Sequence, residues 1–188
     1  MLTAKQLEDA LSALGEVLAD RGKRFEVAII GGGALAIANL IARPTKDLDV
    51  VAMINDGRLE TAAPLPADLV EAIADVAAYL GLASDWLNNG PTAMLRFGLP
   101  EGFLARCDRR AYGGLVVRFA DRLDHIHFKL YAAADDRPGG KHHRDLVALA
   151  PTRDELRAAA RWAREHDPSR EFSQLVDQVL ASFEEDGA

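Results

Sequence analysis

The first part of the chain passes from helical to extended hydrophobic spacing. Four leucines recur at the i, i+4, i+7 spacing of a helix: Leu7, Leu11, Leu14 and Leu18. Thr3 and Gln6 form a capping box ahead of them, so we predict a helix of about 18 residues that ends near Gly22. Residues 25–30 are an apolar run with β-branched members, broken only by Glu26, which predicts a strand buried on both faces.

Three consecutive glycines, Gly31 to Gly33, interrupt this apolar run. Residues 34–41 are alanine-rich and predict a short helix, which Pro44 prevents from continuing. Residues 47–54 predict a second strand. On a strand alternate side chains share a face, so we expect Asp47 and Asp49 to point the same way while the residues between and after them face the core.

The rest of the chain is a loop, a helix, irregular structure, one clear strand and then helices. We predict a loop from Asn55 to Pro66, a helix from about 69 to 80, loops with one short strand near Met94 to Phe97, and a strand at 115–120. Four helices are predicted after it, at about 122–134, 142–149, 153–166 and 170–184. This order predicts an α/β (α+β) core over residues 1–121 and a C-terminal helical region over residues 122–188 packed on that core.

Composition places the chain among ordinary globular proteins, with 49% apolar and 27% charged residues in 188 positions. No apolar run approaches the roughly 20 residues that span a bilayer, and the amphipathic N-terminus is unlike a signal peptide. We therefore expect a cytoplasmic protein without a membrane partner. The single cysteine, Cys107, excludes an intrachain disulfide and a multi-cysteine zinc site.

The formal charge of −7 is unevenly distributed. The window from Leu104 to Asp145 holds nine Lys/Arg against six Asp/Glu, and four of the five histidines lie in it. An acidic protein with one basic stretch is compatible with local handling of a polyanion such as RNA. Ordinary surface charge is the equally simple alternative.

The two aspartates carry the clearest chemical signal. Adjacent carboxylates repel unless a cation or a proton lies between them, so Asp47 and Asp49 predict a divalent-metal site. Hard oxygen ligands favour Mg²⁺ or Mn²⁺ over zinc. Thr45 and Lys46 add a hydroxyl and a positive charge, and Arg43 has the planar fork that binds phosphate in bidentate fashion. The alternative is a solvated strand end or a helix cap.

The glycines Gly31 and Gly32 are a less specific signal than the aspartates, and the ligand that they suggest is a phosphate. Backbone N–H groups of Gly31 and Gly32 could bind a phosphate at a turn before a short helix. The stretch lacks the third glycine of a dinucleotide fingerprint and the GK[ST] of a phosphate loop. A tight strand-to-helix turn that needs small residues is the alternative.

The stretch GGGALAIANLIARPTKDLDVV, residues 31–51, resembles the glycine and D-x-D signature of the DNA polymerase β-like nucleotidyltransferase superfamily. The spelling R-x-T-x-D-x-D, met at Arg43, Thr45, Asp47 and Asp49, is closest to the minimal bacterial AbiEii/MenT-type branch. Later segments resemble the family too, namely DWLNNG at 85–90, LPEGF at 99–103, and the helical stretch with Lys129 and Asp145. The likeness covers roughly residues 25–150.

This resemblance implies a small mixed sheet with flanking helices, and transfer of a nucleoside monophosphate from an NTP to an acceptor hydroxyl. Its sites would be glycines that hold phosphates, aspartates that hold Mg²⁺, and Arg43 and Thr45 that assist. Lys129 would stabilise developing charge, and Asp145 would orient it or accept a proton. RNA, tRNA ends, a small molecule or a protein side chain would be the acceptor, and a cognate antitoxin or toxin a partner.

The residues themselves leave alternatives open for the second pair. Lys129 follows His125 by four positions and can share its helix face, but a surface lysine would look the same. Asp145 could equally cap a helix. Many superfamily members carry a third carboxylate on a neighbouring strand, whereas the strand LVVRFA has none, and Asp121 just beyond it is the nearest candidate. The alternative function is a catalytically reduced nucleotide-binding or protein-binding member, such as a toxin–antitoxin component.

Overall fold

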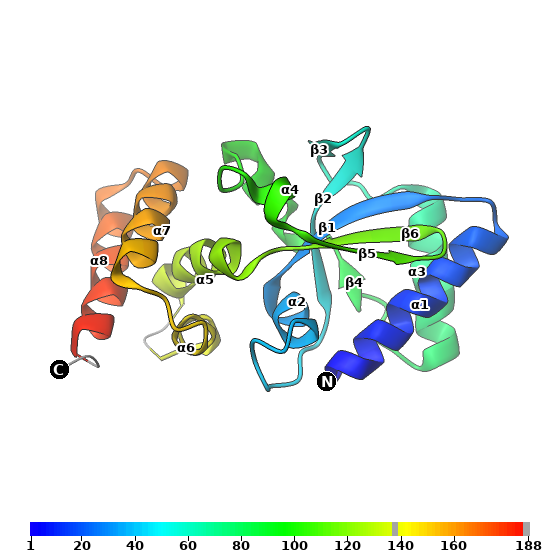
Figure 1. The fold of residues 1–188 in the computed structure, drawn as a ribbon, viewed down its shortest axis with the longest axis horizontal. Coiled ribbons are helices and arrows are strands. Elements are labelled where there is room, and N and C mark those ends of the chain that lie inside the picture. The colour runs from blue at the N-terminus through cyan, green and yellow to red at the C-terminus, as the bar shows by residue number, and fades with distance from the viewer. Residues whose placement is uncertain (137–138, 186–188) are drawn as a thin grey trace. The chain divides into compact units, whose positions relative to one another are not determined.

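A computed structural model describes residues 1–136 and 139–185 of the chain. The chain divides into two compact units, Met1–Asp121 (unit 1) and Arg122–Ala188 (unit 2). Unit 1 contains a mixed sheet with flanking helices, and unit 2 is a helical region (Figure 1). Among the described residues, no helix has both the length and the apolar character needed to cross a membrane.

Unit 1 alternates strands and helices along the chain. Its strands are β1 (Phe25–Ile30), β2 (Leu48–Asn55), β3 (Arg58–Glu60), β4 (Leu87–Asn88), β5 (Asp108–Tyr112) and β6 (Leu115–Phe119). Its helices are α1 (Ala4–Asp20), α2 (Gly31–Ile37), α3 (Ala67–Leu80), α4 (Phe103–Arg106) and the 3₁₀ helix η1 (Gly90–Phe97). The predicted first helix and the predicted strands near 25–30, 47–54 and 115–120 are thus confirmed, within one residue at the strand ends.

The sheet has the order β3-β2-β1-β6-β5, with β4 paired to β2 outside this path. β1 runs antiparallel to β2 and parallel to β6, so the sheet is mixed. The register places Ile30 opposite Asp49, at the end of β1. β4 is parallel to β2 and pairs Asn88 with Asp49. The polar residue at the start of β2 is therefore held between two strands.

Helices α1 and α3 share a hydrophobic core with one face of this sheet. The capping box forms as predicted, because Thr3 Oγ1 accepts from the Gln6 backbone N–H at 3.3 Å and Gln6 Oε1 accepts from the Thr3 N–H at 2.9 Å. Trp86 is fully buried and donates its indole N–H to the carbonyl of Ile73 at 3.2 Å. It is a core residue of unit 1. The leucines of α1 contribute the largest set of fully buried side chains in this core: Leu7, Leu11, Leu14 and Leu18.

Two predicted loops contain strands. The loop expected after residue 54 begins with a hairpin, in which β3 pairs with β2 through a turn at Asp56 and Gly57, both with positive φ. An Asp-Gly pair between extended segments favours this type of turn. β5 was expected to be loop because its sequence DRRAY is polar, but it pairs along its length with β6. The polar side chains gave no strand signal in the sequence. The backbone of β5 nevertheless pairs with β6 as an edge strand.

The strand predicted near Met94 to Phe97 is wrong, because these residues end the 3₁₀ helix η1. Pro91 lies in its first turn, where a missing amide hydrogen costs nothing, and Gly98 follows with φ 91°. The glycines after β1 differ from expectation as well. They form the first turn of α2 rather than a separate turn before a helix at 34–41.

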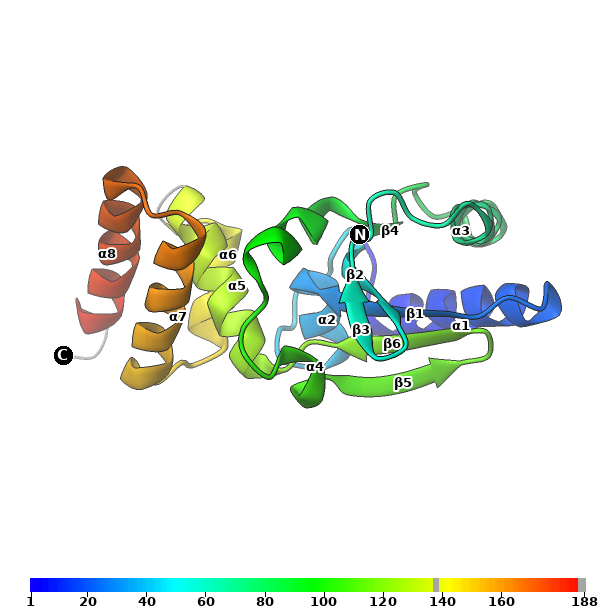
Figure 2. The ribbon, with the colours of Figure 1, turned by 90° about the horizontal axis from the view of Figure 1, so that it is seen from above.

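Unit 2 consists of four helices in its described part, α5 (Arg122–Asp135), α6 (Lys141–Ala148), α7 (Arg153–His166) and α8 (Arg170–Glu185). All four were predicted, within one or two residues at each end. α5 packs against the other three, and α7 and α8 lie side by side (Figure 2). Trp162 of α7 makes edge-on ring contacts with three side chains of α5: His127, Phe128 and Tyr131. Such contacts lock the two helices together.

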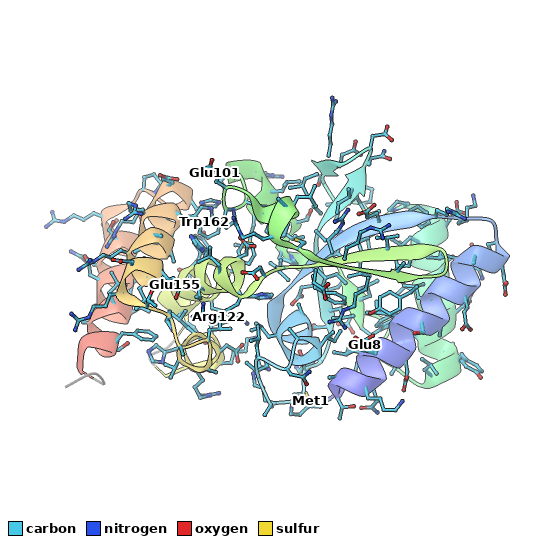
Figure 3. The ribbon with its side chains drawn as sticks, in the orientation of Figure 1. Met1, Glu8, Glu101, Arg122, Glu155 and Trp162 are labelled. Atoms are coloured by element: carbon cyan, nitrogen blue, oxygen red, sulfur yellow. The ribbon has the colours of Figure 1, made fainter. Side chains whose placement is uncertain are left out.

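The start of α5 is fixed to the start of α7 by one arginine (Figure 3). Arg122 donates to both carboxylate oxygens of Glu155, at 2.8 and 3.1 Å, and to the carbonyls of Leu149 and Ala150, each at 2.8 Å. Glu155 is also the acceptor that completes the predicted capping box with Thr152. The Arg122 guanidinium therefore connects the start of α5, the start of α7 and the turn between α6 and α7.

Candidate functional site

Gly31 lies where β1 ends and α2 begins, directly beside Asp49. A Cβ atom placed on Gly31 would lie 2.3 Å from Oδ2 of Asp49, and the glycine has φ 86°. Both observations exclude a larger residue, since the carboxylate occupies the space and the backbone conformation favours glycine. The glycine thus lets the Asp49 carboxylate approach the main chain.

Gly32 lies similarly close to the side chains of two other residues of the predicted site, Arg43 and Thr45. A Cβ atom there would lie 3.0 Å from Nη2 of Arg43 and 3.3 Å from Oγ1 of Thr45. Thr45 is only 5% exposed, and its backbone exchanges two hydrogen bonds with Leu2, of 2.6 and 3.0 Å. That isolated bridge fixes the loop after α2. The structure therefore gathers a carboxylate, a guanidinium and a hydroxyl over two consecutive glycines.

Asp47 lies one residue before β2 rather than inside it, which corrects the predicted strand start. Its backbone carbonyl lies against Gly33, at 2.5 Å from a Cβ placed there, and its side chain is half-buried. Within the described residues its carboxylate makes no hydrogen bond or ion pair. The predicted alternation holds at the next positions, because Leu48 and Val50 are fully buried while Asp49 is half-buried.

Asn88 belongs to this cluster and was not predicted. Its amide nitrogen donates to Oδ1 of Asp49 at 3.3 Å and to the carbonyl of Leu48 at 3.4 Å. Its amide oxygen accepts from the N–H of Gly90 at 2.9 Å. The order of β2, helix α3 and a further extended segment could have placed it, because a strand after a crossover helix commonly returns parallel to its predecessor.

Unit 2 brings the other two predicted residues into direct contact. Lys129 Nζ lies 2.7 Å from Oδ2 of Asp145, and the two side chains are 5% and 2% exposed. The alternative of a surface lysine is therefore wrong. The cap alternative for Asp145 is wrong as well, because α6 begins after Gly140 and Asp145 lies inside it. His125 is buried too.

A further histidine lies in the electrostatic field of this ion pair. Burial, followed by the positive charges of Lys129 and Lys141, lowers the pKa of His142 to about 4. This imidazole is consequently neutral at neutral pH. Its Nδ1 is buried without a hydrogen-bond partner in the described part of the chain. Neither observation supports contact of His142 with an RNA phosphate.

The donor chemistry of unit 1 fits a hard divalent cation. Asp47 and Asp49 supply carboxylate oxygens, and a site with two carboxylates completed by water and substrate phosphates is typical of Mg²⁺. Across residues 1–136 and 139–185, no three His, Cys, Asp or Glu side chains come together as a metal-binding group. Asp121 therefore does not complete a trio with the two aspartates, although β6 is extended toward it by a 3.0 Å bond from Ala120 N–H to the Ile29 carbonyl.

The basic window is partly neutralised by ion pairs within the fold. Four of its arginines and lysines are ion-paired with carboxylates: Arg110, Arg118, Arg122 and Lys129. Their partners include Glu8 and Glu26, which lie far outside the window in sequence. The local excess of positive charge in the sequence thus does not produce an equal excess on the surface.

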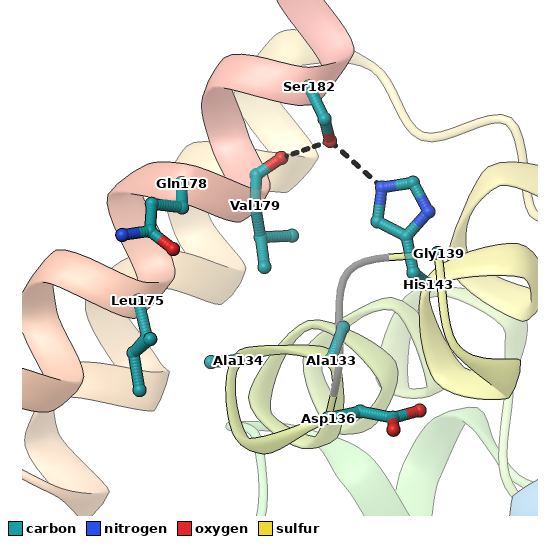
Figure 4. Close-up of a pocket in the computed structure, with 9 residues that line it drawn as sticks. All are labelled: Ala133, Ala134, Asp136, Gly139, His143, Leu175, Gln178, Val179 and Ser182. Atoms are coloured by element: carbon teal, nitrogen blue, oxygen red, sulfur yellow. Dashed lines mark hydrogen bonds between the residues drawn. The ribbon is translucent and has the colours of Figure 1, made fainter.

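A separate cavity of about 180 Å³ lies in unit 2 and contains none of the predicted site residues (Figure 4). His143 Nε2 is 2.8 Å from Oγ of Ser182 on its wall. The serine hydroxyl donates to the carbonyl of Val179 at 2.7 Å, so the imidazole N–H is the donor to Ser182. Asp136 lies apart from the imidazole in Figure 4. The arrangement is a helix-to-helix contact and not a nucleophile with its base.

A scan against protein-family models, a search of curated proteins and a search of solved structures find no match to this chain.

Proposed function

We propose that this protein is a metal-dependent nucleotidyltransferase that moves a nucleoside monophosphate from an NTP to an acceptor hydroxyl. The observation that carries the proposal is the convergence of the Asp49 carboxylate, the Arg43 guanidinium and the Thr45 hydroxyl on Gly31 and Gly32. These three groups come from one stretch of seven residues, 43–49, that lies beside Gly31 and Gly32, and the glycines leave space for them. The family resemblance of the same residues supports the proposal.

Each group has a defined task in such a reaction. The acceptor oxygen bonds to the α-phosphorus, the bond from that phosphorus to the bridging oxygen breaks, and pyrophosphate leaves while the hydroxyl proton passes to a base or to solvent. Arg43 and Thr45 hold phosphate oxygens through a charged fork and a hydroxyl. Asp47 and Asp49 would hold Mg²⁺ or Mn²⁺, which when bound neutralises phosphate charge. The protein contributes mainly positioning and electrostatics.

Lys129 and Asp145 enter the proposal through the family resemblance, in which the lysine stabilises charge on the triphosphate. Their 2.7 Å ion pair supports the orienting role of Asp145 rather than a role as proton acceptor. A carboxylate already paired with an ammonium is a weaker base than an unpaired one. We therefore expect Asp145→Asn to impair activity through Lys129.

The direct test is Mg²⁺-dependent pyrophosphate release from each of the four NTPs. Asp49→Asn should abolish release, because the substitution removes the charge that binds the cation while keeping the shape of the side chain. Asp56→Asn is the matched control, since Asp56 is exposed in the β2–β3 turn and asparagine tolerates its φ of 47°. Full activity in Asp49→Asn would place the reaction elsewhere.

The acceptor is best identified with labelled NTP and a total cell extract. Label entering RNA would indicate an RNA or tRNA acceptor, and label in protein or in small molecules would indicate those classes. Ion pairing of four of the nine basic residues in the window weakens the charge argument that favoured RNA. Retention of a cognate antitoxin or toxin on the immobilised protein tests the partner that the resemblance implies.

A second candidate function is a catalytically reduced nucleotide-binding or protein-binding component. It is favoured by a specific observation, namely that the strand residue paired with Asp49 is the amide Asn88 and not a third carboxylate. Calorimetry with Mg²⁺ and each NTP separates the two functions. Heat of binding without pyrophosphate release over hours would support the binding component.

A further inference from the structure

Asn88 is the one side chain of β4 that contacts the candidate site. Its amide oxygen accepts from the Gly90 N–H, so its amide nitrogen must face Asp49 and the Leu48 carbonyl. The orientation of the side chain is thus fixed by three groups. The parallel pairing of Asn88 with Asp49 also fixes its backbone.

We infer that Asn88 is a positioning residue, which orients the Asp49 carboxylate toward Gly31 and places a neutral amide at the strand position beside it. This inference rests on the proposed function. The bond from Asn88 engages Oδ1 of Asp49, whereas Oδ2 is the oxygen that lies against Gly31. Hydrogen bonds of this kind set which oxygen of a carboxylate is presented to a cation.

The neutral amide also sets the charge of the site. A carboxylate at residue 88 would face Asp49 directly and add a negative charge, whereas the asparagine donates a hydrogen bond instead. Its oxygen accepts from the Gly90 N–H. The site therefore keeps two carboxylates, Asp47 and Asp49, beside the Arg43 guanidinium, and gains no third negative charge at residue 88.

Calorimetric titration of Mn²⁺ into the full chain, with and without NTP, tests the positioning role. Asp49→Asn should abolish Mn²⁺ binding. Asn88→Ala should weaken it by about 10- to 100-fold, the usual loss when a group that orients a ligand is removed. Asn89→Ala is the matched control, because its amide donates to the Ala62 carbonyl at 2.6 Å and has no bond to Asp49. Its affinity should stay within about twofold of the unaltered protein.

The outcomes separate the two proposals. If the unaltered protein binds Mn²⁺, Asp49→Asn does not, and Asn88→Ala binds as tightly as the unaltered protein, the positioning role is overturned and the proposed function stands. If the unaltered protein binds no Mn²⁺ with any NTP, both are overturned. Weakened binding in Asn88→Ala with normal binding in Asn89→Ala supports both.

Asn88→Asp gives a second readout that does not depend on activity. The new carboxylate still accepts from the Gly90 N–H, so the local fold is kept, but it replaces a donor to Asp49 by a like charge. We expect its melting temperature to fall below that of the unaltered protein in chelator and to rise more steeply with Mn²⁺. Asn89→Asp should show no added dependence on Mn²⁺. Equal Mn²⁺ dependence in the two variants would place residue 88 outside the cation site.

Discussion

The two units hold similar charged groups in opposite ways. In unit 2 an acid and a base pair with each other at 2.7 Å, and both are almost fully buried. In unit 1 the aspartates are half-buried, and Asp49 and Arg43 gather over glycines that leave space beside the main chain. The first arrangement satisfies charge inside the protein. The second leaves carboxylate oxygens where a cation and phosphates can reach them.

This difference separates stability from function. A buried ion pair contributes little net stability, but removing one partner leaves an uncompensated charge in a low-dielectric interior. A half-exposed carboxylate loses little stabilisation when it becomes an amide. Removing one partner of the buried pair in unit 2 should therefore cost more stability than Asp49→Asn in unit 1, which should act mainly on cation and nucleotide binding.

The largest effect is expected from Lys129→Met. The methionine fills a similar volume but removes the ammonium that lies 2.7 Å from the buried Asp145 carboxylate, so we expect a loss of about 3–5 kcal/mol of unfolding free energy. Urea unfolding followed by circular dichroism measures it. Asp49→Asn should cost less than this, because the Asp49 carboxylate is half-buried rather than fully buried.

The double variant Lys129→Met with Asp145→Leu is the control for this prediction. Replacing the whole pair by apolar residues removes the unpaired charge, so most of the lost stability should return. A single variant that is as stable as the unaltered protein would show that the carboxylate finds another partner. Equal losses in Lys129→Met and Asp49→Asn would remove the contrast between the units.

A smaller loss is expected when the glycine of unit 1 is filled. Gly31→Ala introduces a methyl group 2.3 Å from the Asp49 carboxylate oxygen, at a residue with φ 86°. We expect about 2–3 kcal/mol of destabilisation together with weaker Mn²⁺ binding, because the carboxylate must move. Thermal unfolding and calorimetry measure the two effects.

Gly57→Ala separates backbone strain from the collision. Gly57 has φ 73° and nothing within 4 Å of a Cβ placed there, so it should lose only about 1 kcal/mol and bind Mn²⁺ normally. If the two alanine variants behave alike, the approach of Asp49 to Gly31 is not what requires the glycine.

Local signals in the sequence were enough for most elements. The capping boxes at Thr3 and Thr152 mark helix starts that the structure contains, because a cap depends only on residues three positions apart. Strands with apolar runs were also predicted. β5 was missed because its stability comes from pairing with β6, and a polar edge strand has no hydrophobic periodicity.

The candidate site likewise contains residues whose proximity the sequence predicted and residues whose proximity it did not. Gly31, Asp47 and Asp49 lie within 19 residues of one another, so their association followed from strand and turn spacing. Asn88 joins them only through the return of β4 beside β2, which is a tertiary pairing. The contact of Lys129 with Asp145 similarly depends on the packing of α5 on α6. Spacing along the sequence does not determine which side chains of different helices or strands contact one another.

The smallest effect is expected at the ion pair between Arg122 and Glu155 in unit 2. This pair is more exposed than the pair between Lys129 and Asp145. The hydrogen bonds from Arg122, followed by the bond with the Thr152 backbone, lower the pKa of Glu155 to about 2 from 4.5. The folded state therefore holds the charged form more strongly than the unfolded state does. This stabilisation is fully present above pH 4.5 and is lost as the pH falls toward 2.

Glu155→Gln removes that titration and keeps a capping-box residue at this position. Urea unfolding at pH 6 should show the unaltered protein to be more stable than the variant, and the difference should shrink by pH 3 because the unfolded-state carboxyl is then protonated. Added salt at pH 6 should reduce the same difference, since both side chains are partly exposed. A difference that is constant from pH 6 to pH 3 would show that Glu155 acts through packing rather than charge.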